Sequence, residues 1–412
     1  METDKTLPNG DFYEEVLCPI CNNAKCAELY RQTKRTGTAL GDVIVTVSQC
    51  RACGFVYNSP RIRTEVMDEY YFSNLLASGQ IYRDRSADGH YPKLHSQRAA
   101  FLGKALSAHS QGRLLDVGCG QGDFLNAVRS LNLSGWELQG LEPSAEACSV
   151  ARSNGLKVKQ GYLGHDRLEE HSFDVITLVS VLEHLPDPKV SVDRICRLLK
   201  PDGIFFVEVP NVIHPELTMS GFFSLEHIQH FTPASLARLC AENDWNEFFV
   251  DDDASEQVIR MVASRDLAGW GLQPQKPPDA DAQQAADAVR RYQTEENQFL
   301  EVLRERVINV VEGWQASGKT IALYGAGAHT AALSSHINLS ENCQFLIDGD
   351  PKKQGREFLG LPVCAPDQIT SLGIDAILIS SHRFQDEIIK TIRKLCGDEV
   401  DVATCYLGEV KV

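Results

Sequence analysis

The chain has 412 residues and a formal net charge of −16, with 43% hydrophobic and 23% charged residues. This length allows two or three domains with their own cores, and the composition is that of an ordinary globular protein. The acidic balance argues against nucleic acid as a main partner, because phosphate binding requires a basic face. We find no apolar run of membrane-spanning length and no signal-peptide pattern, so we expect a cytoplasmic protein without a membrane partner.

Two C-x-x-C pairs near the N-terminus predict a metal site. Cys18 and Cys21 form one pair, Cys50 and Cys53 form the other, and 28 residues separate the pairs. Each pair places two thiolates on one tight turn, and two such turns complete a tetrahedral Cys₄ zinc site. The β-rich stretch 43–47 is typical of a zinc ribbon. We expect structural zinc, because four thiolates close the coordination sphere.

An aromatic and basic segment follows the ribbon, at 70–72 and 82–85. Two interpretations remain open. The segment packs between domains, or it forms a lid that supplies Tyr and Arg side chains to an anionic ligand, assisted by Arg61 and Arg63.

A strand, a glycine loop and a helix follow from residue 112. The apolar strand ends at Asp116 and opens into a D-x-G-x-G-x-G loop. The loop contains Gly118, Cys119, Gly120 and Gly122. Glycine lets the backbone approach a ligand closely, because a Cβ would fill the space. The pattern predicts a nucleotide-binding loop, and the alternative is a turn that only connects strand to helix.

The next strand ends at Glu142, 20 residues after Gly122, where nucleotide-binding folds place a carboxylate on ribose hydroxyls. A carboxylate at the start of the loop, Asp116, would repel a pyrophosphate. It would attract S-adenosylmethionine, which carries an ammonium and a sulfonium and no phosphate. These residues resemble the class I S-adenosylmethionine-dependent methyltransferases, and the resemblance implies an α/β fold with a Rossmann-like sheet.

The following elements extend this resemblance over residues 112–265. The near-continuous apolar stretch 173–179 is expected to be a buried parallel strand. The resemblance implies cofactor contacts on the loops after the strands. The candidates are Pro143, Tyr162, Leu163 and Ser180.

The stretch 224–233 groups three ionisable side chains, Glu226, His227 and His230. On a helical turn the two histidines would share a face. We consider three interpretations: a metal site, a loop that shapes the rim of the active site, or a general base His227 that Glu226 orients. His184, which follows the strand beside the cofactor, is a competing base.

A second nucleotide-fold pattern begins near residue 320. Strands are expected at 320–324 and 343–347, with a glycine loop at 325–330 between them and Asp348 after the second strand. The loop lacks a preceding acid, and Thr330 replaces its third glycine. Two roles remain open: phosphate binding by backbone N–H groups, or a structural or dimerising domain.

We predict four segments: a zinc-ribbon and substrate-side module at 1–94, the methyltransferase domain at 95–265, a linker and helix at 266–317, and a Rossmann-like domain at 318–412. This order resembles the nucleotide-sugar C-methyltransferases. The resemblance implies a small-molecule substrate, a deoxysugar on a nucleoside diphosphate, methylated at the carbon next to a keto group. The family base is the His of a Tyr-x-Glu-His segment.

Glu226, His227 and His184 match that family, whereas Ser224 stands where the family has Tyr. The alternatives are an O- or N-methyltransferase of another metabolite or polysaccharide precursor, and a protein that senses ligands without catalysis. The oligomeric state stays open.

Overall fold

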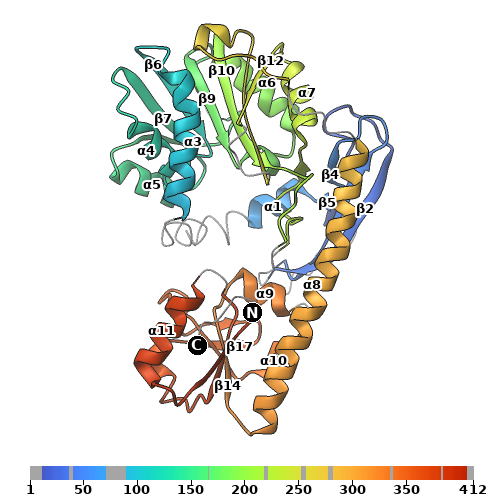
Figure 1. Cartoon of the computed structure of the whole chain (residues 1–412), viewed down its shortest axis with the longest axis vertical. Helices are drawn as coiled ribbons and strands as arrows, with labels where there is room; N and C mark the ends of the chain where they lie inside the picture. Colours follow the sequence, from blue (N-terminus) through green and yellow to red (C-terminus); the bar gives the residue numbers. More distant parts are fainter. Residues whose placement is uncertain are drawn as a thin grey trace. The chain divides into compact units, whose positions relative to one another are not determined.

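The computed structural model of the chain describes residues 12–36, 40–70, 90–165, 167–217, 221–251, 257–276, 282–334, 337–381 and 384–405 (Figure 1). The chain forms two compact units, each assembled from separate stretches of sequence. The first comprises Met1–Arg31, Thr46–Glu216 and Leu225–Arg290, and the second comprises Gln32–Val45, Leu217–Ser224 and Arg291–Val412. No helix within the described ranges is long and apolar enough to cross a membrane.

The larger sheet of the first unit has seven strands in the order β12-β13-β10-β9-β6-β7-β8. Their bounds are Gly112–Val117 (β6), Trp136–Glu142 (β7), Lys157–Gln160 (β8), Phe173–Val179 (β9), Leu199–Pro210 (β10), Glu247–Val250 (β12) and Val258–Ser264 (β13). Strands β6 to β10 are parallel, whereas β13 is antiparallel to both β10 and β12. The strand order reverses between β6 and β9, where open α/β sheets bind ligands beyond the carboxyl ends of their strands. The predicted Rossmann-like sheet is confirmed.

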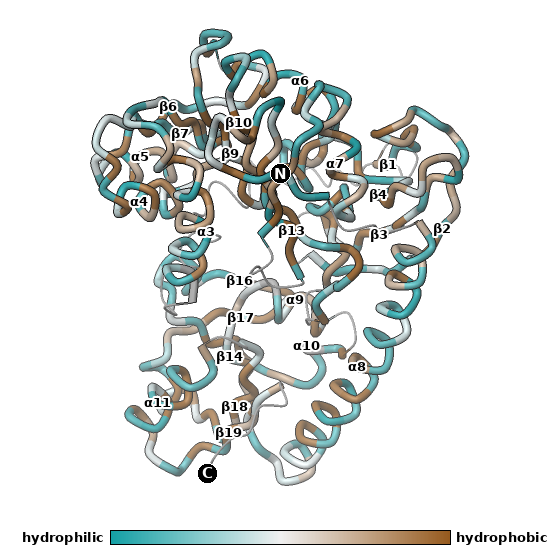
Figure 2. Tube along the Cα trace, turned by 45° about the horizontal axis from the view of Figure 1, so that its top comes forward, coloured by the Kyte–Doolittle hydropathy of each residue, from teal (hydrophilic) through white to brown (hydrophobic). Residues whose placement is uncertain are grey.

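Helices cover both faces of this sheet. They are α3 (His90–Leu106), α4 (Asp123–Arg129), α5 (Ala145–Ser153), α6 (Pro188–Leu198) and α7 (Pro233–Ala241), with short 3₁₀ turns η2 (Leu182–His184) and η3 (Ala268–Trp270). Residues of α3, α4 and α5 share one hydrophobic core with Leu114 and Val175, and residues of α6 and α7 share the other with Leu115 and Ile176. Successive strand residues point to opposite faces, so an apolar strand feeds both cores. The hydrophobic colour accordingly follows the strands of this sheet in Figure 2.

The N-terminal strands form a four-stranded sheet, in the order β11-β4-β3-β2, with one strand from a distant part of the chain. The strands are Cys26–Arg35 (β2), Asp42–Cys50 (β3), Val56–Asn58 (β4) and Gln229–His230 (β11). Strands Tyr13–Glu14 (β1) and Arg61–Ile62 (β5) pair separately, and helix α1 spans Thr64–Tyr70.

Strand β11 changes the interpretation of the segment around the two histidines. Gln229 pairs with Tyr57 and His230 pairs with Val56. The segment is therefore extended, and the helical turn that would place His227 and His230 on one face is wrong. Pairing with strand β4, which lies far away in the sequence, overrides the local i, i+3 pattern, as tertiary context commonly does.

The second unit contains a six-stranded sheet in the order β16-β17-β15-β14-β18-β19. Its strands are Ile321–Tyr324 (β14), Phe345–Ile347 (β15), Glu357–Phe358 (β16), Leu361–Cys364 (β17), Ala376–Ile379 (β18) and Asp401–Thr404 (β19). All except β16 run parallel. Helix Ala282–Ala316 (α8) contributes its residues from Arg291 onward to this unit. The other elements are Ala328–Ser334 (α9), Leu339–Asn342 (α10), Pro366–Gln368 (η4) and Gln385–Cys396 (α11). The second predicted Rossmann-like domain is confirmed.

Helix α8 lies within the linker and helix segment predicted at 266–317. Its residues Leu300, Leu303, Val307 and Val311 recur at a spacing of three or four and are buried in the core of the second unit. An apolar stripe with this spacing lies along one side of a helix and packs that side against the core.

A buried ion network lies at the carboxyl end of β10 in the first unit. Glu208 accepts hydrogen bonds from Arg98 Nε (2.8 Å) and Arg260 Nε (2.6 Å), and Arg260 also pairs with Asp251. Burial alone would raise the pKa of Glu208, but the hydrogen bonds and positive charges of the two arginines lower it. The network ties α3 and β13 to the edge of the sheet where ligands are expected.

We predict that Glu208→Ala destabilises the first unit by about 3–5 kcal/mol, because it leaves a buried positive charge without its main partner. Urea unfolding followed by tryptophan fluorescence measures the change, since Trp136, Trp245 and Trp270 all lie in this unit. Glu137→Ala is the matched control: its side chain is 42% exposed, and the expected change is within about 0.5 kcal/mol. Equal effects of the two substitutions would contradict this account.

Candidate active site and metal centre

The glycine loop after β6 adopts a backbone that few other residues tolerate. Gly118 and Gly122 have φ angles of 72° and 85°, in the left-handed region. A Cβ at Gly118 would lie 2.5 Å from Val181 Cγ2, and one at Gly122 would lie 2.1 Å from Leu156 Cδ1. Backbone conformation and close packing therefore both require glycine at these positions.

Glu142, at the end of β7, fixes the loop. Its Oε2 accepts the Gly120 N–H and its Oε1 accepts the Ser144 N–H, both at 2.9 Å. Ser144 in turn caps α5 by accepting the Ala147 N–H. A carboxylate offers about four acceptor positions, so one side chain can accept several N–H and O–H groups at once.

Asp116, at the end of β6, is 2% exposed and accepts a hydrogen bond from the Thr177 hydroxyl at 2.7 Å. Burial, together with the charge of Glu142, raises the pKa of Asp116 to about 7. The Thr177 hydrogen bond and the charge of Arg98 act in the opposite direction and lower this pKa. A bound cation would favour the ionised form, so this carboxyl suits a positively charged ligand.

The other predicted cofactor residues occupy the loops that follow the neighbouring strands. Ser180 directly follows β9, with φ 55°, and its N–H bonds the Glu208 carbonyl. Cys119 is buried against Gly140 of β7, where a Cβ would lie 2.4 Å from its sulfur. Burial raises the pKa of the Cys119 thiol, so we expect it to stay protonated.

Pro143 lies between Glu142 and the start of α5, and its carbonyl accepts a hydrogen bond from the Gln160 side chain. Tyr162 and Leu163 follow β8; Tyr162 is 41% exposed, whereas Leu163 packs against the core. All of these loops lie at the carboxyl edge of the sheet.

Two histidines and a buried carboxylate meet beside this edge. The rings of His184 and His227 have centroids 4.8 Å apart and are nearly perpendicular. Glu183 Oε1 lies 3.9 Å from His184 Nε2, and donor atoms of Glu183, His184 and His227 all lie within 4.8 Å of one another. Sequence reasoning missed Glu183, because its burial depends on contacts between distant segments.

Glu226 lies in a different environment from the one expected. Its Oε1 accepts a hydrogen bond from the Tyr70 hydroxyl at 3.0 Å, and its backbone carbonyl lies 3.0 Å from His184 Nδ1. Among the described residues, the carboxylate grouped with the two imidazoles is Glu183 and not Glu226. Tyr70 belongs to the aromatic segment noted in the sequence, whereas its other aromatic and basic positions, 71–72 and 82–85, lie outside the described residues.

The two arginines expected to assist that segment lie close to carboxylates of the N-terminal module. Arg61 pairs with Glu14 at 2.9 Å and donates to the Pro186 carbonyl, and Arg63 lies 3.6 Å from Glu65.

The environment of His230 differs from that of His227. It is 3% exposed, and its Nε2 lies 2.9 Å from Asn58 Oδ1. Burial, together with the charge of His227, lowers the pKa of His230 to about 3. It therefore remains neutral at physiological pH, and the structure gives no support to a metal site shared by His227 and His230.

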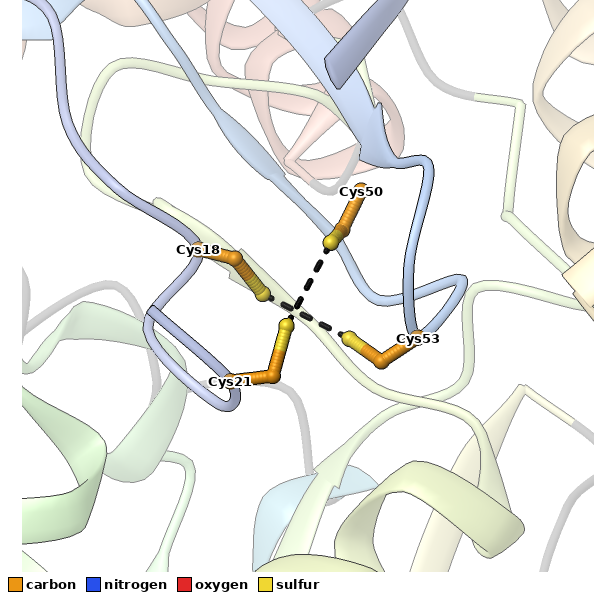
Figure 3. Close-up of side chains that lie close together, drawn as sticks. All are labelled: Cys18, Cys21, Cys50 and Cys53. Atoms are coloured by element: carbon orange, nitrogen blue, oxygen red, sulfur yellow. Dashed lines mark hydrogen bonds between the residues drawn. The ribbon is translucent and has the colours of Figure 1, made fainter. Parts of the chain in front are cut away.

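The four cysteines of the two C-x-x-C pairs point toward one another (Figure 3). The Sγ atoms of Cys18 and Cys53 are 3.5 Å apart, as are those of Cys21 and Cys50. Four sulfurs around zinc, with bonds of about 2.3 Å, would lie about 3.8 Å apart. The donor set and its geometry therefore fit a tetrahedral metal ion.

Polar groups of the second glycine loop form hydrogen bonds with side chains of the second unit. Asp348 accepts the Ala326 N–H at 2.8 Å and pairs with Lys353 at 3.1 Å. The Thr330 hydroxyl lies 2.6 Å from the Ser380 hydroxyl and also bonds the Gly325 carbonyl. These contacts explain why Thr stands where a third glycine was expected.

Comparison with known proteins shows which families this chain resembles. A family model described as a methyltransferase domain matches residues 89–247, and one described as a C-methyltransferase C-terminal domain matches residues 277–402. The chain is 26% identical to C-methyltransferase NovU of Streptomyces niveus over 90% of this chain and 91% of that protein.

Other similarities are partial. A ubiquinone biosynthesis O-methyltransferase of Idiomarina loihiensis is 29% identical to this chain in the matched region. That region covers 35% of this chain and 63% of that protein. Among solved structures, the CurJ carbon methyltransferase is similar with a TM-score of 0.39 and 17% identity, over 47% of this chain and 58% of that chain.

We predict that Asp116→Asn and Glu142→Gln each weaken S-adenosylmethionine binding roughly ten- to a hundredfold. Each removes a charge-assisted contact worth about 1.5–3 kcal/mol and preserves the size of the side chain. Isothermal calorimetry measures the dissociation constants, with the half-exposed Glu137→Gln as control. Unchanged affinity in both folded variants would refute the assignment of these two carboxylates to the cofactor site.

Proposed function

We propose that this chain, as a class I S-adenosylmethionine-dependent methyltransferase, methylates a carbon atom next to a keto group. In this proposal the acceptor is a small molecule, a nucleotide-linked deoxysugar. The observation that carries this proposal is the similarity to a protein named as a C-methyltransferase over 90% of the chain. The family match at residues 277–402 supports it, because that family is described by carbon methylation. The nucleotide-sugar acceptor rests on the order of the three domains.

In this proposal His227 is the general base. S-adenosylmethionine supplies an electrophilic methyl group when bound, and the carbon next to the ketone must lose its proton to attack it. A neutral imidazole with a pKa near 6.5 when unperturbed suits this task at neutral pH. The cofactor loop held by Glu142 and the histidines beside the same sheet edge would bring the two reactants together.

His184 is the competing base. Its Nδ1 lies beside the Glu226 carbonyl, which leaves Nε2 to face the centre of the cluster. His227 follows Glu226 directly, so the hydrogen bond between Tyr70 and Glu226 would help to hold the His227 backbone. Mutation of each histidine separately distinguishes the two roles.

An O-methyltransferase is the second candidate, favoured by the similarity to a protein named as a ubiquinone biosynthesis O-methyltransferase. That similarity covers 35% of this chain, whereas the similarity to the C-methyltransferase covers 90%. An N-methyltransferase and a ligand sensor have no comparable support here.

We predict that the protein exchanges a proton for deuterium at the carbon next to the ketone of a nucleoside-diphosphate-linked keto-deoxysugar in D₂O. NMR measures the exchange, and mass spectrometry measures methylation of the same carbon. His227→Ala should lower both rates by about 10²–10⁴, the usual contribution of a general base, with unchanged cofactor affinity. His171→Ala, an exposed histidine at the opposite end of β9, is the control and should retain the wild-type rates.

Methyl transfer to oxygen without exchange would instead support the O-methyltransferase. Loss of activity in His184→Ala with normal turnover of His227→Ala would make His184 the base.

We also propose that Cys18, Cys21, Cys50 and Cys53 hold one structural zinc ion. The four sulfurs form a closed set, and no coordination position would remain for catalysis.

Metal analysis of protein purified without added zinc should find one zinc per chain. Cys50→Ser should lose the metal and lower the melting temperature, because three thiolates no longer close the site. Cys26→Ser is the matched control, since Cys26 lies outside the cluster, and should retain both. Full metal content in Cys50→Ser would contradict this site.

A further inference from the structure

We propose that Glu183 is a positioning residue that stabilises the protonated form of the His184–His227 pair. The inference rests on the proposed histidine base and identifies a partner for it. Glu183 lies in the 3₁₀ turn η2, directly after the sheet edge that carries the cofactor loop, and is 1% exposed. Its carboxylate and the two imidazoles lie within 4.8 Å of one another.

The backbone around Glu183 holds this arrangement together. The Glu183 carbonyl accepts the Ile228 N–H at 2.9 Å, and His184 Nδ1 lies 3.0 Å from the Glu226 carbonyl. These contacts join η2 to the segment that carries His227 on both sides of that residue. The main-chain segments that carry the carboxylate and the two rings are therefore held against each other.

An ionised carboxylate at this distance favours a positively charged imidazole. An opposite charge within about 4–6 Å stabilises the charged form, and a buried carboxylate is costly unless it is compensated. When the base accepts the proton of the acceptor carbon, the imidazolium would form beside Glu183. The carboxylate of a Ser-His-Asp triad stabilises an imidazolium in the same way without taking the proton itself.

The neighbouring titratable groups do not replace this role. Glu226 accepts a hydrogen bond from Tyr70 of α1, and burial together with Glu226 raises the pKa of that phenol, which stays protonated. His230 of β11 remains neutral, because burial lowers its pKa to about 3. Within the described residues, Glu183 is thus the acid grouped with the two rings.

A metal ion is the competing explanation of the same three side chains. Bonds of about 2.0–2.2 Å would hold neighbouring donor atoms about 3.0–3.5 Å apart around a tetrahedral or octahedral ion. Glu183 Oε1 and His184 Nε2 are 3.9 Å apart, which fits a charge interaction better than shared coordination.

The test compares Glu183→Gln, which keeps the shape and removes the charge, with Glu183→Asp, which keeps the charge. NMR titration of labelled histidine in the full chain measures the imidazole pKa values without any acceptor. In Glu183→Gln the pKa of His184 or His227 should fall by about 1–3 units, because the stabilising charge is lost. The acidic limb of the kcat/KM profile should move to lower pH by the same amount, while cofactor affinity stays unchanged.

The control is Glu169→Gln, an exposed acid in the same domain, which should change neither quantity. Unchanged histidine pKa values in folded Glu183→Gln would overturn the inference, and the proposed base would still stand if His227→Ala abolished deuterium exchange. If Glu183→Gln does not fold, Glu183→Asp decides: a smaller fall in pKa is expected, and no change overturns the proposal. Activity that is lost on chelation and restored by a second metal ion per chain would overturn it in favour of a metal site.

Discussion

The cofactor half of the site depends on one carboxylate that holds a glycine loop by its main chain. Glu142 accepts the N–H groups of Gly120 and Ser144, so one side chain at the end of β7 fixes both the loop after β6 and the start of α5. A loop of glycines has a large conformational entropy, and such anchoring lowers the cost of holding it in the shape a ligand requires. The second unit contains the same device: Asp348 at the end of β15 accepts the Ala326 N–H of its own glycine loop. The acid after the second strand is therefore a structural requirement of the glycine loop in both units, in addition to the cofactor contact that we propose for Glu142.

The acceptor half depends on pairing between distant segments. Strand β11 joins the N-terminal sheet, and the ring of Phe231 packs against Phe55, which follows the second C-x-x-C pair. The Cys50 N–H donates to the Phe55 carbonyl, so the knuckle that carries two of the proposed metal ligands also holds the strand with which β11 pairs. A metal in the cysteine cluster would thus stabilise the segment that presents His227 without taking part in chemistry. Residues of the N-terminal module accordingly share a hydrophobic core with the large sheet.

The sequence predicts well what is local or periodic. The D-x-G-x-G-x-G loop, the spacing to Glu142 and the two C-x-x-C pairs are short patterns, and the structure has both α/β sheets and one cluster of four sulfurs. It predicts poorly what depends on long-range contacts. The extended form of the segment around His230 depends on β4, and the burial of Glu183 depends on the same packing. Glu183 stands beside His184 in the sequence, but nothing local tells which acid, Glu183 or Glu226, lies nearest to the imidazoles.

Burial then decides which histidine can carry a proton. His230 and His227 are three positions apart, yet His230 is enclosed with Asn58 and its imidazolium is so unfavourable that its pKa falls to about 3. A group with that pKa binds a proton too weakly to act as a base at neutral pH. His227 instead lies against a second imidazole and a carboxylate. If His227 is the base, as proposed, the negative charge of Glu183 would oppose the cost of burying an imidazolium, and the neighbouring ring would offer a second nitrogen for the proton. The same stretch of chain thus contains one histidine that supports the fold and one that we propose as the base.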